Sequence, residues 1–187
     1  QLAHKQKALF ARIEPVLTKH KVALSDFKLK HALKDIQQPQ TWVLNLEQSE
    51  DEIMAGFTPT NRNLYRNAGN KGLTIRQSHD PKDVKIFLQM IHDVVAHTGI
   101  VAHSDNYYTV MAETLLPRKA GVIYIVEHEG SPVGAAFVFD SPTTRYYAHA
   151  GSLLRARKLH PGTPLLANMI FDAKAQGQTE FDFVGVA

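Results

Sequence analysis

The chain has 187 residues, a length that predicts one globular domain, or one domain with a fragment of a second. Apolar residues make up 44% of it and charged residues 21%, and no apolar run reaches the ~18 residues of a membrane span, which excludes disordered, collagen-like and integral-membrane classes. The absence of cysteine excludes a disulfide scaffold, an Fe–S cluster, a thiolate zinc site and a cysteine nucleophile.

The net charge of +3 is uneven, because residues 1–34 carry eight Lys or Arg and only two acidic residues. This basic segment is a candidate contact for tRNA or an anionic membrane surface, and a solvated basic face is the alternative. Within it, residues 9–13 are predicted as a strand and residues 16–32 as one or two surface helices. The β-branched, aromatic and aliphatic residues 41–46 predict another strand.

Two short helices are predicted next. Ser49 and Glu52 have the spacing of a capping box, which starts the first helix. Thr58 precedes Pro59 and is the expected cap of the second. The alternation in residues 73–76 then predicts a strand.

The longest amphipathic helix is predicted from Asp80, with Pro81 in the first turn, to Gly99. A second helix is predicted from Ser104 to the break at Pro117.

Three strands joined by turn signals follow, which predicts an antiparallel meander. They are Val122–His128, Val133–Phe139 and Arg145–Ala150. A helix capped by Thr163-Pro164 leads to a last strand, Glu180–Val184, and a helix between two strands of one sheet implies parallel pairing. The predicted fold class is α/β, a mixed sheet with flanking helices.

This order of elements resembles the first five strands of the GNAT N-acyltransferase fold, and five segments resemble the FemABX peptidyltransferases within it. The segments are Arg12-Ile13-Glu14-Pro15, residues 38–46, residues 62–68, Tyr147-Ala148-His149-Ala150-Gly151-Ser152 and Phe181-Asp182-Phe183-Val184-Gly185. Members of this family carry two tandem GNAT-like domains.

The resemblance implies that residues 1–46 are the C-terminal part of a first GNAT-like domain. Residues 47–72 would connect it to a second, residues 73–187, that lacks its last strands. No heptad-rich hairpin occurs, so the chain is similar to the simpler monomeric type. The family's closing F-K-x-G-F-G segment, with the lysine linked to transfer, is expected beyond Ala187, and we expect this piece alone to be inactive.

The activity implied is aminoacyl transfer from aminoacyl-tRNA to the stem peptide of lipid II or of a UDP-linked muropeptide precursor. The ester is already reactive, so the enzyme needs mainly to position both substrates, remove a proton and stabilise the oxyanion. No cofactor is expected. The expected location is cytoplasmic, with peripheral contact to the inner membrane surface.

Two alternatives remain. One is a GNAT enzyme with another acyl donor, although the loop that would cradle a pyrophosphate has Pro161 and Pro164 in place of two N–H donors. In that loop Arg155, Arg157 and Lys158 are candidates for binding phosphate of tRNA or of the precursor, and a solvated loop is the alternative. The other is a catalytically idle domain that binds nucleic acid or a partner.

Tyr107 and Tyr108 are candidate substrate-binding residues at the start of a helix. In the family a tyrosine here, with an arginine four residues before it, helps to bind the precursor's diphosphate. His103 occupies the place of that arginine and offers one neutral donor instead of a charged fork. Packing of one tyrosine in the core is the alternative.

Strand alternation places Tyr147 and His149 on one face and Tyr146 on the other. The family has a substrate-contacting tyrosine in this strand, and we assign it to Tyr147, with a cross-strand aromatic pair as the alternative. Asp182, between two phenylalanines, is the candidate catalytic carboxylate, with hydrogen bonding to a neighbouring loop as the alternative.

The ten histidines do not form a metal-binding pattern. His92 and His97 are five residues apart, which does not place them on one helix face, and no H-E-x-x-H occurs.

Overall fold

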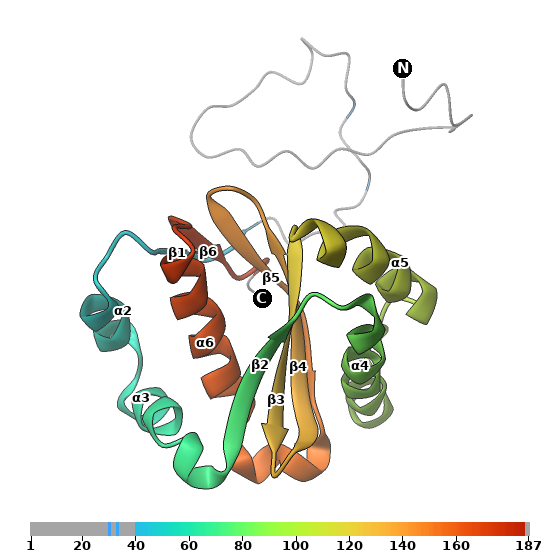
Figure 1. Cartoon of the computed structure of the whole chain (residues 1–187), viewed down its shortest axis with the longest axis horizontal. Coiled ribbons are helices and arrows are strands. Elements are labelled where there is room, and N and C mark those ends of the chain that lie inside the picture. Colours follow the sequence, from blue (N-terminus) through green and yellow to red (C-terminus); the bar gives the residue numbers. More distant parts are fainter. Residues whose placement is uncertain (1–29, 31–32, 34–39, 186–187) are drawn as a thin grey trace. The chain divides into compact units, whose positions relative to one another are not determined.

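The computed structural model describes residues 30, 33 and 40–185 (Figure 1). Residues 41–184 form a compact unit. The strand predicted over 9–13 and almost all of the helical segment predicted over 16–32 lie outside the described residues.

The compact unit is built on one six-stranded sheet of order β1-β6-β5-β4-β3-β2. The strands are β1 (Val43–Asn45), β2 (Leu73–Ser78), β3 (Gly121–His128), β4 (Ser131–Asp140), β5 (Thr144–Ser152) and β6 (Glu180–Asp182). The predicted meander is confirmed, because β2 to β5 pair antiparallel in sequence order. The predicted parallel pairing of the last strand is also confirmed, since β6 runs parallel to β5.

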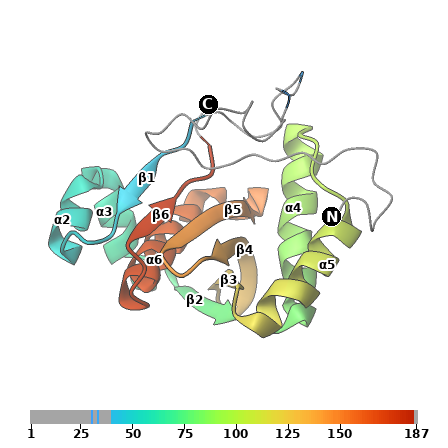
Figure 2. The same cartoon turned by 90° about the horizontal axis from the view of Figure 1, so that it is seen from above.

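Helices cover both faces of the sheet, with α4 and α5 on one face and α6 on the other (Figure 1, Figure 2). The helices are α2 (Glu50–Gly56), α3 (Pro59–Arg66), α4 (Val84–Thr98), α5 (Asp105–Leu115) and α6 (Gly162–Ala175). Short 3-10 turns are η2 (Gly69–Lys71), η3 (Pro81–Asp83), η4 (Leu116–Arg118) and η5 (Leu154–Leu159). None of the helices that the structure describes combines the length and apolar character that a bilayer crossing requires.

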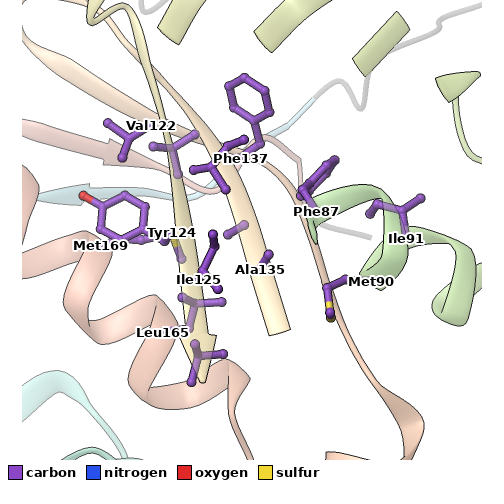
Figure 3. Packing of buried hydrophobic residues seen from close by; sticks show 14 of the residues in the cluster. Phe87, Met90, Ile91, Val122, Tyr124, Ile125, Ala135, Phe137, Leu165 and Met169 are labelled. Atoms are coloured by element: carbon purple, nitrogen blue, oxygen red, sulfur yellow. The ribbon is translucent and has the colours of Figure 1, made fainter. Parts of the chain in front are cut away.

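The core has two halves, one on each side of the sheet (Figure 3). On one side Phe87 of α4 meets Phe137 of β4 edge to face, with ring centroids 6.0 Å apart. On the other side Tyr124 of β3 lies with Leu165 and Met169 of α6 (Figure 3). Burial of these large side chains on both faces fixes the sheet between its helices.

The helix starts follow from local capping. The Ser49 hydroxyl accepts a hydrogen bond from the Glu52 N–H, and the Glu52 carboxylate accepts one from the Ser49 N–H, as the capping box predicts. Thr58 caps α3. Asp80 caps the 3-10 turn η3 rather than the α-helix itself, so α4 begins one turn later than predicted, at Val84.

Strand β1 lies at the edge of this sheet, where Val43 pairs with Asp182 of β6. We had assigned residues 41–46 to the end of a first domain, but the strand completes the sheet that contains β2 to β6. Pairing over a long sequence separation decides its place, and local pattern carries no information on it. The division of the chain into parts of two GNAT-like domains stays a prediction.

Candidate functional site

Strand β5 contains a β-bulge that reorders its side chains. Phe137 of β4 pairs with His149 and the next residue, Val138, pairs with Tyr147, so Ala148 has no partner in β4. Directly opposed residues share a face of the sheet, and an inserted residue reverses the alternation. Tyr147 and His149 therefore lie on opposite faces. The prediction that they share one face is wrong, because it assumed an uninterrupted strand.

His149 lies on the face covered by α4 and α5. Its ring centroid is 5.1 Å from that of Tyr108, 5.8 Å from that of His103 and 6.2 Å from that of Tyr107. We call these four side chains the aromatic cluster. The structure thus brings together three of the predicted site residues with one, His149, that the sequence did not select.

Tyr147 does not belong to the aromatic cluster. It shares the α6 face with Val138, and its ring lies 6.4 Å from that of Phe181. Burial raises the pKa of Tyr147. The assignment of the substrate-contacting residue of this strand to Tyr147 is therefore corrected in favour of His149.

The start of α5 sets the geometry of the cluster. Ser104 caps the helix and accepts a hydrogen bond from the Tyr107 N–H over 3.3 Å. His103, just before the cap, stacks on Tyr107 with centroids 4.2 Å apart. Tyr107 is 41% exposed, whereas Tyr108 is 3% exposed and packs edge to face on Phe87. Tyr108 is a core residue, and His103 and Tyr107 form the accessible side of the cluster.

The cluster carries little charge at neutral pH. Burial, with a smaller contribution from His103, lowers the pKa of His149 to about 4. Burial also raises the pKa of Tyr108. His149 is therefore a neutral ring that both donates and accepts a hydrogen bond.

An open groove of about 490 Å³ runs along the outer side of α5 and begins at the cluster. Its lining residues are mostly apolar and all come from α5 and its cap: Ser104, Asn106, Tyr107, Val110, Met111, Thr114 and Leu115. Because Tyr107 belongs to both, the aromatic cluster and the α5 groove form one continuous surface.

The far half of β5 has a free edge. Strand β6 pairs only with Thr144, Arg145 and Tyr146, and no other strand in the described part of the chain pairs with that edge. Unpaired backbone N–H and C=O groups beyond Tyr146 are therefore open to an extended ligand.

The predicted phosphate-binding cations lie on η5. Arg155, Arg157 and Lys158 are exposed, and no hydrogen bond or ion pair to another described residue occupies their side chains. The turn itself is anchored, because Ala156 is buried and the Leu154 N–H donates to Asp93 of α4 over 2.7 Å.

Helix α6 follows this turn and begins at Gly162, slightly earlier than its predicted cap at Thr163. Pro161 and Pro164 flank its first turn and have no N–H to offer. The loop therefore offers cationic side chains and few backbone donors.

Asp182 lies at the end of β6 and is half-buried. Its carboxylate accepts hydrogen bonds from the Thr41 hydroxyl and, over 2.7 Å, from the Val184 N–H. These bonds tie the edge of the sheet together and do not reach the aromatic cluster. They match the hydrogen-bonding alternative for Asp182, and a catalytic role for it stays a prediction.

A buried ionic network was missed by sequence reasoning. Arg145 is fully buried, donates to both carboxylate oxygens of Asp140 over 2.8 and 2.9 Å, and donates to Asp172 over 2.7 Å. Tyr124 also donates to Asp172, and Arg145 donates to the Tyr124 hydroxyl. Although burial alone would raise it, the hydrogen bonds from Arg145 and Tyr124 lower the pKa of Asp172. The network fastens the start of β5 to α6.

Among the described residues, no group of three or more His, Asp or Glu is arranged to hold a metal ion. His92 is hydrogen-bonded to Asp105 over 2.7 Å, and His97 to the backbone of Asp93 over 2.6 Å. The two histidines thus have separate partners.

Residues 60–187 match the family of the acetyltransferase (GNAT) domain, and the chain belongs to that family. Its fold is FemX-like: the crystal structure of FemX superposes with a TM-score of 0.75 at 16% sequence identity, over 87% of this chain and 58% of that one. No curated protein sequence matches the chain.

Two further structures share the fold. The C-terminal domain of a putative lysylphosphatidylglycerol synthetase from Agrobacterium fabrum has a TM-score of 0.61 and 14% identity, covering 78% of this chain and 46% of that one. L-PGS from Bacillus licheniformis has a TM-score of 0.55 and 13% identity, covering 79% and 45%. The chain thus spans roughly half the length of these proteins. The predicted FemX-like GNAT fold is confirmed.

Proposed function

We propose that the chain is part of an aminoacyltransferase that moves an amino acid from aminoacyl-tRNA to the stem peptide of a peptidoglycan precursor. The observation that carries the proposal is the loop before α6. Three exposed cations, Arg155, Arg157 and Lys158, lie there without a described partner, and Pro161 and Pro164 remove backbone donors. Such a loop suits the phosphates of a nucleic acid better than a backbone cradle for a coenzyme pyrophosphate.

The FemABX-like segments and the FemX-like fold support the same class of reaction. In this reaction the acceptor amine forms a bond to the ester carbonyl carbon, the bond from that carbon to the ribose oxygen breaks, and one proton passes from the amine to the departing oxygen. An activated ester needs positioning and proton handling rather than a covalent enzyme intermediate.

The aromatic cluster supplies groups for that step. The neutral ring of His149 is able to accept a hydrogen bond from the attacking amine and to donate one to the departing oxygen. His103 and Tyr107 are the accessible members that would contact the precursor. The free edge of β5 would align the stem peptide.

A GNAT enzyme with another acyl donor is the second candidate. The family description, acetyltransferase (GNAT) domain, favours it. The two candidates differ in the donor, so donor binding separates them.

The test is a titration of the natural protein that carries this chain with aminoacyl-tRNA, uncharged tRNA and acetyl-CoA. We expect tRNA to bind and the simultaneous change of Arg155, Arg157 and Lys158 to alanine to weaken it at least tenfold. A matched control changes three other exposed cations, Arg66, Lys82 and Lys85, and should leave the affinity nearly unchanged.

Tight binding of acetyl-CoA without binding of tRNA would move the assignment to the second candidate. Equal affinity for charged and uncharged tRNA, with no transfer, would instead favour a nucleic-acid-binding domain.

A further inference from the structure

Helix α5 has a second apolar side that faces away from the core. Tyr108 and Ala112 point inward and are buried. Tyr107, Val110, Met111 and Thr114 recur at intervals of three and four residues, which places them together on another side of the helix. Val110 is 51% exposed, so this side has an apolar surface open to solvent.

The polar groups of the α5 groove are already engaged within the helix. The Thr114 hydroxyl donates to the Val110 carbonyl over 2.7 Å. The Ser104 hydroxyl accepts from the Tyr107 N–H. What these residues offer to a ligand is mainly carbon surface, and an apolar ligand loses no hydrogen bonds by lying there.

The groove is also within the size range of ligand sites, about 300–1,000 Å³. It begins at Tyr107, which belongs to the aromatic cluster as well. A ligand whose polar part lies at His103 and Tyr107 would therefore extend its next segment along Val110 and Thr114. That segment must be apolar to suit the lining.

We propose that the α5 groove binds the hydrocarbon chain of a lipid-linked acceptor, with the adjoining diphosphate at His103 and Tyr107. This inference rests on the proposed function and decides between its two precursor forms, since a nucleotide-linked precursor would place a uridine in the groove. A uridine has several donors and acceptors that the engaged hydroxyls of Ser104 and Thr114 would leave largely unpaired.

The test is a titration of the full 187-residue chain with farnesyl diphosphate below its micellar concentration, with inorganic diphosphate and UDP as the comparison ligands. We expect farnesyl diphosphate to bind at least tenfold tighter than either. Val110→Asp should remove this preference, and Thr114→Trp should do the same by filling the groove without adding charge. Leu154→Asp is the matched control, because Leu154 is 49% exposed but lies outside the groove.

Equal binding of all three ligands, tighter binding of UDP, or a preference that survives both groove variants would overturn the inference. A preference that Leu154→Asp also removes would overturn it too, since the binding would then be unspecific. Transfer to a UDP-linked precursor without a preference for farnesyl diphosphate would leave the proposed function standing and the inference refuted. The preference without any transfer would refute only the function.

Discussion

Tyr147 and His149 lie on opposite faces of β5, because Ala148 between them has no partner in β4. This bulge sends Tyr147 toward Phe181 and His149 toward Tyr108. The aromatic cluster at the start of α5 therefore exists only because one residue is inserted in the strand. In a regular strand His149 would share a face with Tyr147, away from α5.

The buried neutral state of His149 predicts an acid-sensitive fold. Its pKa of about 4 in the folded chain lies below the ~6.5 of an unfolded histidine, so the unfolded state binds the proton first as the pH falls. The contribution is fully present above pH ~6.5 and is lost as the pH falls toward 4. We expect His149→Phe to reduce the loss of unfolding free energy between pH 7 and pH 5 by about 1–2 kcal/mol.

Urea unfolding of both proteins at the two pH values measures this difference. His92→Phe is the control, because His92 is an exposed histidine on the surface of α4. An unchanged pH dependence in His149→Phe would contradict the buried neutral ring.

The ionic network predicts a large cost for losing its central cation. Arg145→Ala leaves Asp140 and Asp172 without their buried partner, and breaking a buried pair costs about 3–5 kcal/mol. Arg76→Ala breaks the surface pairs with Asp83 and Glu127 and should cost at most about 1 kcal/mol. Chemical denaturation of the two variants measures the contrast, and equal costs would refute the burial argument.

Gly151 is predicted to be required for the packing of α4 on β5. A Cβ atom there would lie 3.0 Å from the Met90 carbonyl oxygen, a backbone atom that cannot rotate away. We expect Gly151→Val to lower the unfolding free energy by about 1–3 kcal/mol. Gly56→Ala is the control, since nothing lies within 4 Å of the added atom. Thermal unfolding of both variants tests the difference.

The two neighbouring tyrosines of α5 are predicted to fail in different ways. Tyr108→Ala empties a core position that is 3% exposed and should cost about 3–5 kcal/mol of unfolding free energy. Tyr107→Ala removes an exposed ring and should cost about 0.5 kcal/mol while reducing acceptor binding. Unfolding curves and acceptor titrations of both variants measure this. Strong destabilisation by Tyr107→Ala would place that ring in the core instead.

The features that the sequence predicted are those set by local chemistry. The Ser49 and Thr58 caps need only neighbours within three residues, and the meander follows from alternation and turn signals. The features it did not predict depend on distant partners. The bulge at Ala148 is defined by register with β4, and β1 finds its place through β6.

The candidate site divides along the same line. His103, Tyr107 and Tyr108 were predicted together because they are close in sequence. His149 and the network around Arg145 were missed because their partners come from other elements, such as Asp172 of α6. A strand arginine near Asp140 and just after Pro142 was the one local sign of the network.

The most direct test of the central claim is the mass of a lipid-linked or UDP-linked muropeptide precursor after incubation with charged tRNA and the natural protein that carries this chain. The account predicts a product heavier by one amino-acid residue, with the rate at least tenfold lower for His149→Phe and unchanged for Leu154→Asp. No mass gain with any charged tRNA, together with acetylation of an amine from acetyl-CoA, would contradict it.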